Sequence, residues 1–595
     1  MSVVGDDTKK RWSRDLHKRR RGATELGLQA DEQIEKLLIR RFDRLVSVRR
    51  FILLWIALFL LLFYVGFMQI RSLSPFYQSL QPVAGGIYSE GIIGDFSNAN
   101  PIYAISDADS AVSHMVFSGL FKYDDDNQLI GDLAKDYTLD TSQKRYTVHL
   151  KRGLKWHDGK PFTADDVVFT YQTIQDPEAQ SPLYAGWQGI RVSRVDAYTV
   201  FFDLPSSLGS FPYSLTNGIV PLHLHKKVVP AQMRSEPFNT SPVGTGPFVW
   251  KFVQVSGATN ADRQQRISLA AYDHYWGGRP KLDGFNLTTF SDDKHLVEAF
   301  KKKQISAMAG LESLPDELVG DSGVHVYTTP LTSIVMTFFN NSNPILADAN
   351  VRKSLVSGTD RSHIPALLSY PVSLADGPLL RGQLGYDSSV TQIDYDTDNA
   401  NKLLDQAGWR RDENGQRMKA GKELALSLVS QDTTEYTQVA QFLQRQWSQL
   451  RVKVDVHYFS GDELQALKIA NHDYDILLYG ISVGVDPDVF AYWDSSQASL
   501  SSQGHLNLSE YKSRVVDQAL EQARTRSDPA LRVAKYKVFL TEWVKDAPAM
   551  ALYQPNVLYV ARGQVFNFQR KASNVSIDRY NNVNEWMVRQ RHQIL

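Results

Sequence analysis

At 595 residues the chain is longer than one ordinary domain, because chains beyond about 250–300 residues usually divide into several hydrophobic cores. Lys and Arg total 65, as do Asp and Glu, so the overall charge indicates no polyanionic partner such as a nucleic acid. The sequence has no cysteine, which excludes disulfides, thiolate metal sites, a cysteine nucleophile and a lipid anchor on cysteine.

The first recognisable element is an uncharged apolar run, FILLWIALFLLLFYVGFMQI, at residues 51–70. At about 1.5 Å of rise per residue, a helix of this length spans a hydrocarbon core of about 30 Å. A buried core helix is the alternative, but the run is apolar on every face. A cleaved signal peptide has a shorter apolar core and small residues at its cleavage site, whereas this run continues into GFMQIRSL. We therefore expect one retained transmembrane helix.

The residues before this helix form a basic tail. Residues 1–50 carry 14 Lys or Arg and 8 Asp or Glu, and arginines crowd the flank of the helix at Arg40, Arg41, Arg44, Arg49 and Arg50. The positive-inside rule places residues 1–50 in the cytoplasm and the chain after about residue 71 outside. Nucleic-acid binding by the basic run 9–21 is an alternative to a topogenic tail beside anionic lipid. The spacing from Ile34 to Leu45 predicts a short amphipathic helix.

After residues 71–84, expected to be a polar linker, a long mixed α/β region begins at Gly85. Alternating apolar residues predict strands at 146–150, 198–204, 452–459 and 474–480, and helical spacing predicts helices at 399–408, 436–450 and 513–524. The elements intermix without a regular βαβ order. This pattern favours mixed α/β lobes over a barrel.

The segment LKWHDGKPFTADD, residues 154–166, has the most reactive-looking composition. One His among scattered Asp lacks the paired spacing of a zinc motif, and no convergent acid or base partner is apparent. Asp158-Gly159 suits a tight turn, and Thr163 suits the N-cap of a helix with Asp166 in its first turn. We predict that this segment is scaffolding.

The residues around this segment, YTVHLKRGLKWHDGKPFTADDVVFTYQ, resemble the signature region of the family 5 extracytoplasmic solute-binding proteins. These are the oligopeptide-, dipeptide- and nickel-binding components of ABC importers. Other blocks stand in the family's order: VFSGLFKYD (116–124), IGDLAKDYTLD (130–140), SPVGTGPFVWKF (241–252), NNSNPILADANVRKSLVSGTDR (340–361), DNANKLLDQAGWR (398–410) and DYDILLYGISVGVDPDVF (473–490). The resemblance covers roughly residues 85–590.

The resemblance implies an α/β fold of the two-lobed periplasmic-binding-protein type (type II, cluster C-like), with a hinge and an interlobe cleft. We expect lobe I, with its extra subdomain, at 85–340 plus 556–590, and lobe II at 341–555. The closed, loaded protein would be presented to membrane permease subunits whose ATPases lie in the cytoplasm. The chain would be a binder of peptides or another small solute and not an enzyme, with no cofactor and no metal. In keeping with this, the sequence has no Ser-centred elbow, phosphate loop or HExxH.

Two segments are carried over from the resemblance as ligand contacts. In peptide-binding members, a segment after the first strand lies along the peptide backbone, and PIYAISDADS (101–110) matches it, with Ile105, Ser106 and Asp107 as candidates. An ordinary polar loop is the alternative. The second segment follows the strand at 474–480 and gives Gly480, Ser482, Val483, Asp486 and Trp493 as candidates.

The second segment departs from the pattern of the peptide binders. These carry a Trp followed three residues later by an Asp that pairs with the free amino group of the peptide. Alignment on Asp486-Pro487 puts Gly480 at the Trp position and Val483 at the Asp position. A buried ammonium without a carboxylate would be unstable. We therefore hypothesise that the ligand is not a short peptide held by its N-terminus at this place.

Several alternatives stay open at the level of sequence. Asp486 and Asp488 either replace the missing charge or cap a loop. Trp187, Tyr492 and Trp493 either line the cleft or belong to the core. A ligand sensor that signals inward is a second class of function, and a surface hydrolase that uses acids such as Asp107 and Asp486 is a third.

Overall fold

The computed structural model describes residues 49–259, 262–368, 370–500, 506–568 and 571–594. The chain divides into two compact units, residues 1–81 with 590–595, and residues 82–589. The predicted tail, with its basic run at 9–21 and the amphipathic helix from Ile34, lies outside the described residues apart from Arg49 and Arg50.

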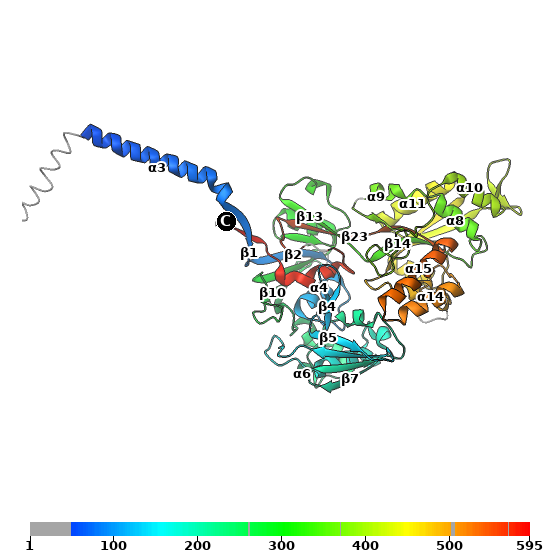
Figure 1. Cartoon of the computed structure of the whole chain (residues 1–595), viewed down its shortest axis with the longest axis horizontal. Helices are drawn as coiled ribbons and strands as arrows, with labels where there is room; N and C mark the ends of the chain where they lie inside the picture. Colours follow the sequence, from blue (N-terminus) through cyan, green and yellow to red (C-terminus); the bar gives the residue numbers. More distant parts are fainter. Residues whose placement is uncertain (1–48, 260–261, 369, 501–505, 569–570, 595) are drawn as a thin grey trace, which may run out of the picture. The chain divides into compact units, whose positions relative to one another are not determined.

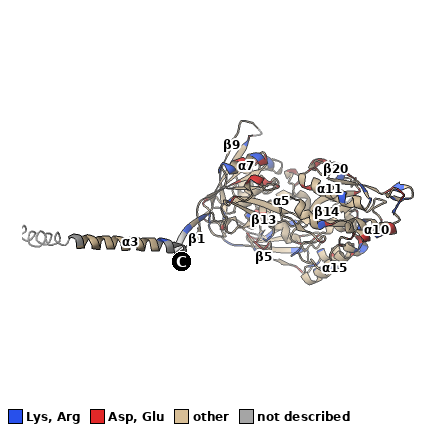
Figure 2. Ribbon diagram, turned by 90° about the horizontal axis from the view of Figure 1, so that it is seen from above, with Lys and Arg blue, Asp and Glu red and all other residues tan. Residues whose placement is uncertain are grey.

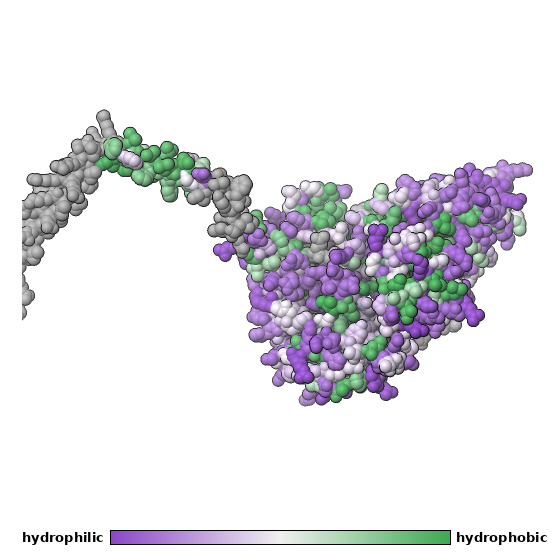
Figure 3. Space-filling view, viewed as in Figure 1, coloured by the Kyte–Doolittle hydropathy of each residue, from purple (hydrophilic) through white to green (hydrophobic). Residues whose placement is uncertain are grey.

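The first unit contains one long helix, α3 (Arg49–Tyr77). Its stretch Phe51–Gln69 has a mean hydropathy of 2.7 and none of it is buried, so by length and composition it qualifies as a membrane span. Figures 2 and 3 show that this stretch carries no charge and is apolar over most of its length. Residues 71–84, expected as a polar linker, instead continue this helix to Tyr77 and then form strand β1 (Gln78–Val83). Strand β1 pairs with β24 (Arg589–Ile594).

The second unit contains two main sheets (Figure 1). The first has seven strands in the order β13-β23-β12-β2-β11-β10-β9, and β2 pairs in parallel with both β11 and β12. Its strands are β2 (Ile87–Ile93), β9 (Phe248–Ser256), β10 (Gln264–Ala271), β11 (Gly284–Phe290), β12 (Ala307–Ala309), β13 (Val324–Pro330) and β23 (Asn556–Arg562). Helices α4 (Asp107–Val116) and α7 (Asp293–Lys301) pack on this sheet, whereas α5 (Ala164–Gln175) and α6 (Leu222–His225) belong to the insert.

A smaller sheet, in the order β5-β6-β8-β7, belongs to the insert within this half of the chain. Its strands are β5 (Ala134–Leu139), β6 (Arg145–Leu150), β7 (Arg191–Asp196) and β8 (Thr199–Asp203), and beside it β3 (Phe121–Tyr123) pairs with β4 (Leu129–Gly131). Strands β6 and β8 confirm the strands predicted at 146–150 and 198–204. On β6, Tyr146, Val148 and Leu150 are buried, so the alternation of the sequence directs one face into the core.

The second main sheet has six strands in the order β15-β22-β14-β21-β19-β20. They are β14 (Ser333–Phe339), β15 (Ser373–Leu374), β19 (Ala425–Gln431), β20 (Lys453–Phe459), β21 (Ile476–Ser482) and β22 (Ala549–Gln554). On β14, Val335 and Phe339 enter one hydrophobic cluster, while Ile334, Met336 and Phe338 enter another. Because successive side chains of a strand point to opposite faces, the sheet is buried on both sides.

Helices cover both faces of this second sheet, and several of them, such as α11 and α15, are labelled in Figure 1. They are α8 (Ala349–Ser357), α9 (Ile364–Leu367), α10 (Thr397–Gln406), α11 (Thr434–Gln449), α12 (Gly461–Glu463), α13 (Phe490–Trp493), α14 (Arg514–Arg524) and α15 (Pro529–Asp546). A small sheet joins β16 (Arg410–Arg411), β17 (Arg417–Lys419) and β18 (Lys422–Glu423). The strands predicted at 452–459 and 474–480 and the helices predicted at 399–408, 436–450 and 513–524 are confirmed by β20, β21, α10, α11 and α14.

Short helical turns complete the described elements. The 3₁₀ turns are η2 (Pro177–Ala179), η3 (Tyr184–Trp187), η4 (Phe211–Thr216), η5 (Pro230–Ser235), η6 (Pro237–Thr240), η7 (Asp316–Leu318), η8 (Arg361–His363), η10 (Ser495–Gln497) and η11 (Ser576–Glu585). One π-helical turn is η9 (Leu464–Ile469).

The chain crosses between the two main sheets twice, and the crossings lie side by side. It leaves the first sheet between β13 and β14 and returns between β22 and β23. The backbone N–H of Leu331 donates to the Pro555 carbonyl at 2.9 Å, and the Gln554 side chain donates to the Leu331 carbonyl at 2.7 Å. Strand β14 belongs to the second sheet, whereas the expected division put residues up to 340 in lobe I. That the two sheets move as separate lobes about these crossings stays a proposal.

A buried ion pair fixes the returning chain to the first sheet. Glu90 lies on β2, the central strand, and Arg579 lies on η11. Their side chains are 0% and 5% exposed, and Arg579 Nη2 lies 2.7 Å from Glu90 Oε1. The hydroxyls of Tyr580 and Tyr559 also donate to this carboxylate, at 2.5 and 2.9 Å. Every oxygen of the buried carboxylate is thereby hydrogen-bonded, as a charge in the interior requires.

The segment at residues 154–166 is scaffolding in the structure as well. Helix α5 begins after Thr163, whose backbone N–H donates to Asp166 Oδ2 at 2.9 Å. The turn at Asp158-Gly159 closes through a bond from the Gly159 N–H to the Trp156 carbonyl, and Gly159 has φ +85°. His157 contacts the turn at Gly244 and Gly246: Nδ1 accepts from the Gly244 N–H at 3.2 Å, and Nε2 donates to the Gly246 carbonyl at 2.9 Å.

This arrangement of His157 predicts a loss of stability in acid. One ring nitrogen accepts a hydrogen bond, so the ring must be neutral, and burial lowers the pKa of His157 from 6.5 to about 4. Between these values the unfolded chain binds the additional proton, so the free energy of unfolding falls as the pH falls, by at most about 1.4 kcal/mol per pH unit. Burial also lowers the pKa of His225 to about 4, which acts in the same direction.

The variant His157→Gln separates this contribution from the others. Urea unfolding of the full chain in detergent, at steps from pH 7 to pH 4.5, should give a shallower loss of stability for the variant than for the parent protein. Equal slopes in the two proteins would show that His157 is not held neutral by the fold.

Candidate ligand-binding site

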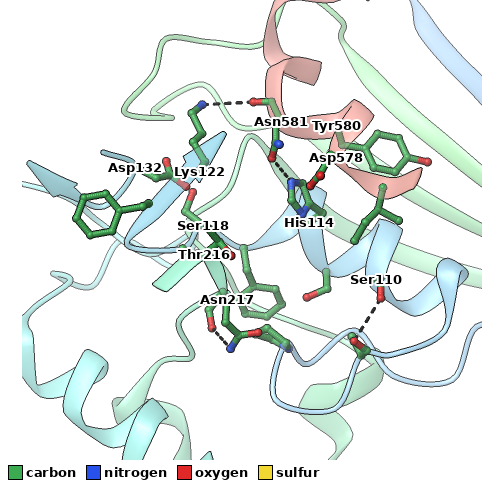
Figure 4. Close-up of a pocket in the computed structure, with 18 of the residues that line it drawn as sticks. Ser110, His114, Ser118, Lys122, Asp132, Thr216, Asn217, Asp578, Tyr580 and Asn581 are labelled. Atoms are coloured by element: carbon green, nitrogen blue, oxygen red, sulfur yellow. Dashed lines mark hydrogen bonds between the residues drawn. The ribbon is translucent and has the colours of Figure 1, made fainter. Parts of the chain in front are cut away.

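The most prominent cavity described lies within the half of the chain that contains the first sheet. It has a volume of about 560 Å³ and is bordered by α4, β3, the turn at 214–218 and η11 (Figure 4). These segments are distant in the sequence, and the C-terminal one is placed by the ion pair of Arg579 with Glu90. The cavity therefore depends on the return of the chain from the second sheet.

Polar and charged groups of both signs line this cavity. His114 on α4 faces Asn581 on η11, with Nε2 at 2.5 Å from Asn581 Oδ1, and Lys122 on β3 reaches the Asn581 carbonyl at 3.4 Å (Figure 4). Burial lowers the pKa of His114 and raises that of Asp132. The walls can thus bind the polar parts of a solute through hydrogen bonds. Among the described residues no cluster of three or more His, Asp or Glu has the arrangement of a metal site.

The first predicted segment borders this cavity but does not point its three candidates into it. Ser106 caps α4, and its hydroxyl accepts from the Asp109 N–H at 3.1 Å. Asp107 lies in the first turn of α4 and accepts from the Ser576 hydroxyl at 3.5 Å, and Ile105 is 70% exposed. Pro101, Ala104 and Ser110 of the same segment line the cavity instead. A role for Ile105, Ser106 and Asp107 in ligand binding stays a prediction.

The second predicted segment lies where the chain crosses between the sheets. The Val483 N–H donates to the Thr332 carbonyl at 2.9 Å, which places the end of β21 beside the first crossing. Val483 itself is buried, and Ser482 is exposed. A Cβ atom on Gly480 would lie 2.9 Å from the Tyr436 hydroxyl. Tyr436 therefore occupies space that a Trp at position 480 would need.

Two candidates of this segment have structural roles in the fold. Asp486 forms a two-pronged ion pair with Arg532, with distances of 2.7 and 2.6 Å and both side chains below 9% exposed. Its carboxylate is already neutralised, so it does not replace the missing charge. Trp493 has no exposed surface and stacks on Phe338 in the core, with the ring centroids 5.9 Å apart. The core interpretation therefore describes Trp493 in this structure, and its contact with ligand stays a prediction.

The remaining candidates, Trp187, Tyr492 and Asp488, differ in whether they line the cavity or support the fold. Trp187 is mostly buried but forms part of the cavity wall. Tyr492 donates to the Ser482 carbonyl at 2.8 Å and so supports the end of β21. Asp488 accepts from Arg524 at 3.2 Å and from Ser210 at 3.1 Å, and Ser210 belongs to the other half of the chain.

No motif in the sequence points to His114, Asp578 or Asn581 as wall residues. His114 falls on the helix predicted by no motif, and Asp578 and Asn581 follow the last recognisable block by many residues. Their proximity arises only when η11 packs against α4. The one usable indication was the resemblance itself, because it assigned residues 556–590 to lobe I.

Comparison with known proteins identifies this architecture. The family model described as "Bacterial extracellular solute-binding proteins, family 5 Middle" matches residues 128–502. The chain belongs to this family. The relatives include the oligopeptide-binding protein AppA of Bacillus subtilis, 26% identical over 496 residues that make up 80% of this chain and 87% of AppA.

Solved structures agree over a similar length. NikZ of Campylobacter jejuni, determined in complex with Ni(L-His), is 25% identical with a TM-score of 0.68 and covers 85% of this chain and 100% of NikZ. AppA of Bacillus subtilis, determined in complex with a nonapeptide, is 24% identical with a TM-score of 0.65 and covers 86% of this chain and 100% of AppA. The expected α/β, two-lobed periplasmic-binding-protein fold is confirmed.

The environment of Asp486 predicts that its removal destabilises the fold. Asp486→Asn leaves the guanidinium of Arg532 buried without its carboxylate, and breaking such a pair lowers the free energy of unfolding by about 3–5 kcal/mol. The matched control is Asp387→Asn, which breaks a more exposed pair with Lys537 and should lower it by no more than about 1 kcal/mol. Urea unfolding measures both. Unchanged stability with loss of ligand affinity would instead make Asp486 a ligand residue.

Proposed function

We propose that this protein is a membrane-anchored extracytoplasmic receptor that captures a peptide or peptide-like solute between two lobes and delivers it to an ABC permease. The observation that supports this most directly is the pair of adjacent crossings that join the two sheets, in a chain that belongs to the family 5 solute-binding proteins. Two polypeptide connections side by side form a narrow hinge, about which two rigid sheets can close on a ligand.

Contacts between the halves support closure on the side of the insert. The Gly209 N–H donates to the Arg524 carbonyl at 3.0 Å, and the hydroxyls of Ser207 and Ser210 donate to the Thr525 carbonyl and to Asp488. A Cβ atom on Gly209 would lie 3.0 Å from the Arg526 carbonyl, so this approach favours glycine. These bonds would hold the end of α14 when the lobes are together.

The ligand is proposed to lie between the first segment, Ile105 to Asp107, and the end of β21, Gly480 to Val483. The names of the relatives support a peptide or peptide-like solute, because AppA is an oligopeptide-binding protein. The side chain at 483 is a buried valine, so no carboxylate is available there for a peptide amino group. An internal stretch of a longer peptide, or another solute, fits this position better than a short peptide held by its N-terminus.

The anchor is proposed to be α3, with residues 1–50 in the cytoplasm and the solute-binding unit outside the membrane. The support is the apolar stretch Phe51–Gln69 and the arginines that precede it. A membrane-spanning helix confines the receptor near its permease and raises its effective concentration there. No observation favours a sensor or a hydrolase.

Closure can be measured directly because the chain has no cysteine of its own. Spin labels on Lys160→Cys and Lys402→Cys, both exposed and one in each half, report the distance between the halves. A peptide mixture from a protein digest should shorten this distance in the detergent-solubilised protein, while free amino acids should have less effect. An unchanged distance with peptides and with a broad nutrient panel would contradict the proposed function.

The topology has its own test. Protease treatment of intact cells, or of spheroplasts where an outer membrane is present, should release a fragment of roughly 500 residues, because the proposed orientation exposes the chain after α3. An antibody against an epitope before residue 49 should then detect only a short, membrane-bound remnant. Full protection of the large fragment would reverse the orientation.

A further inference from the structure

Glu435 is a half-buried carboxylate with no cationic partner among the residues that the structure describes. It lies in the first turn of α11, and its Oε1 accepts a hydrogen bond from the Tyr553 hydroxyl at 2.5 Å. Burial and then the charge of Glu435 raise the pKa of Tyr370. Across the described part of the chain, no Lys, Arg or His pairs with Glu435. Within those residues its charge is met by the Tyr553 hydroxyl and by the N-terminal end of α11, and not by a cation.

The tyrosines around Glu435 form a compact group. Burial and the charge of Glu435 raise the pKa of Tyr370 and Tyr553, so both hydroxyls stay protonated. Tyr436, the next residue on α11, also has a pKa raised by burial and then by Glu435, and its hydroxyl lies close to Gly480, 2.9 Å from where a Cβ atom of that residue would stand. The half-buried carboxylate attracts a cation through its charge, and the buried Tyr553 holds the carboxylate in place through its hydroxyl.

This group lies where the two halves meet. Helix α11 follows β19, which runs parallel to β21, so Glu435 and Gly480 lie at the same edge of the second sheet. Tyr370 precedes Pro371, whose carbonyl accepts from the Asn556 side chain at the second crossing, at 2.6 Å. Glu312 of the first half is close enough for its charge to raise the pKa of Tyr370. Ligands of α/β sheets bind outside the carboxyl ends of the strands, which is this edge.

Other acids near the crossings are already neutralised. Asp486 pairs with Arg532, and Asp488 pairs with Arg524. Glu435 differs because no cation pairs with it among the described residues, so its half-buried carboxylate is free to pair with a cationic group of a ligand. Tyr436 also fills space next to Gly480, so an aromatic ring is present beside this strand although the strand itself lacks the Trp.

We propose that Glu435, with Tyr370, Tyr436 and Tyr553, forms a subsite that binds a positively charged ammonium or guanidinium group of the captured solute. The inference rests on the proposed function and specifies its ligand. The subsite supplies from α11 the negative charge that Val483 cannot supply from the end of β21. The charged group is either the amino terminus of a peptide or a basic side chain.

The subsite can be tested without knowing the solute. Thermal unfolding of the full chain in detergent is measured with n-butylammonium chloride, with n-butanol, and with sodium chloride at the same ionic strength. The ammonium should raise the Tm of the parent protein by about 1–2 °C at concentrations well above its Kd, relative to both controls. The variant Glu435→Gln should lose this shift. Asp432→Asn, which removes an exposed carboxylate just before the same helix, should keep it.

Peptides then distinguish the two sources of the charge. Calorimetry compares tetra-alanine, N-acetyl-tetra-alanine and an N-acetylated tetrapeptide with one lysine. If the subsite binds an amino terminus, only tetra-alanine should bind at least about tenfold more tightly than N-acetyl-tetra-alanine. If it binds a basic side chain, only the N-acetylated peptide with lysine should bind more tightly than N-acetyl-tetra-alanine by that factor. In either case Glu435→Gln should abolish the difference. Peptide binding with no preference for charge, or the same preference in Glu435→Gln, would overturn the inference while leaving peptide capture intact.

The stability of Glu435→Gln separates a ligand subsite from a structural hydrogen bond. Because the substitution removes an unpaired charge but keeps an acceptor for Tyr553, the ligand-free variant should be at least as stable as the parent protein. A clear loss of stability would assign Glu435 to the fold. An ammonium shift in the parent protein together with no binding of any peptide would support the subsite and reject a peptide as the solute.

Discussion

The buried pair of Glu90 and Arg579 is the interaction on which the rest of this architecture depends. The chain leaves the first sheet at β13, builds the whole second half and returns as β23, so its last segment must be fixed again to the half where it began. A guanidinium on η11 bound to a carboxylate on the central strand does this, and an unpaired charge in that interior would be strongly destabilising. The same segment carries Asp578 and Asn581 into the wall of the 560 Å³ cavity. One ion pair therefore positions both the return of the chain and one wall of the cavity.

The acids near the crossings differ in whether a basic side chain neutralises them. Those that are neutralised hold the fold, and one that is not stays available for a ligand. Asp486 is bound by Arg532 and Asp488 by Arg524, and both pairs lie beside the loop that follows β21. These pairs rigidify the loop but leave no charge for a solute. Among the described residues, Glu435 at the start of α11 accepts from the Tyr553 hydroxyl and has no cationic partner. The proposed subsite accounts for this unpaired carboxylate through a cation of the solute.

Local features of the sequence were predicted well because they depend on nearby residues. The alternation at residues 146–150 and the helix after Thr163 both appear where the pattern placed them, as β6 and α5. The sequence left the roles of Asp486 and Trp493 open because their partners, Arg532 and Phe338, lie far away in the sequence and no local pattern reveals them. The cavity was invisible for the same reason, since α4 and η11 are separated by most of the chain. The linker at 71–84 was misjudged differently: its polar composition did not reveal that it pairs with β24.

The close approach of Tyr436 to Gly480 bears on where the proposed subsite can lie. A Cβ atom at position 480 would lie 2.9 Å from the Tyr436 hydroxyl, so a larger side chain on β21 would require the Tyr436 ring to shift. Val483 is a buried valine and offers no charge at the end of β21, whereas Glu435 offers one at the start of α11. In the proposed subsite the positive end of the ligand is therefore held from α11, while the ion pairs of Asp486 and Asp488 hold the loop that follows β21.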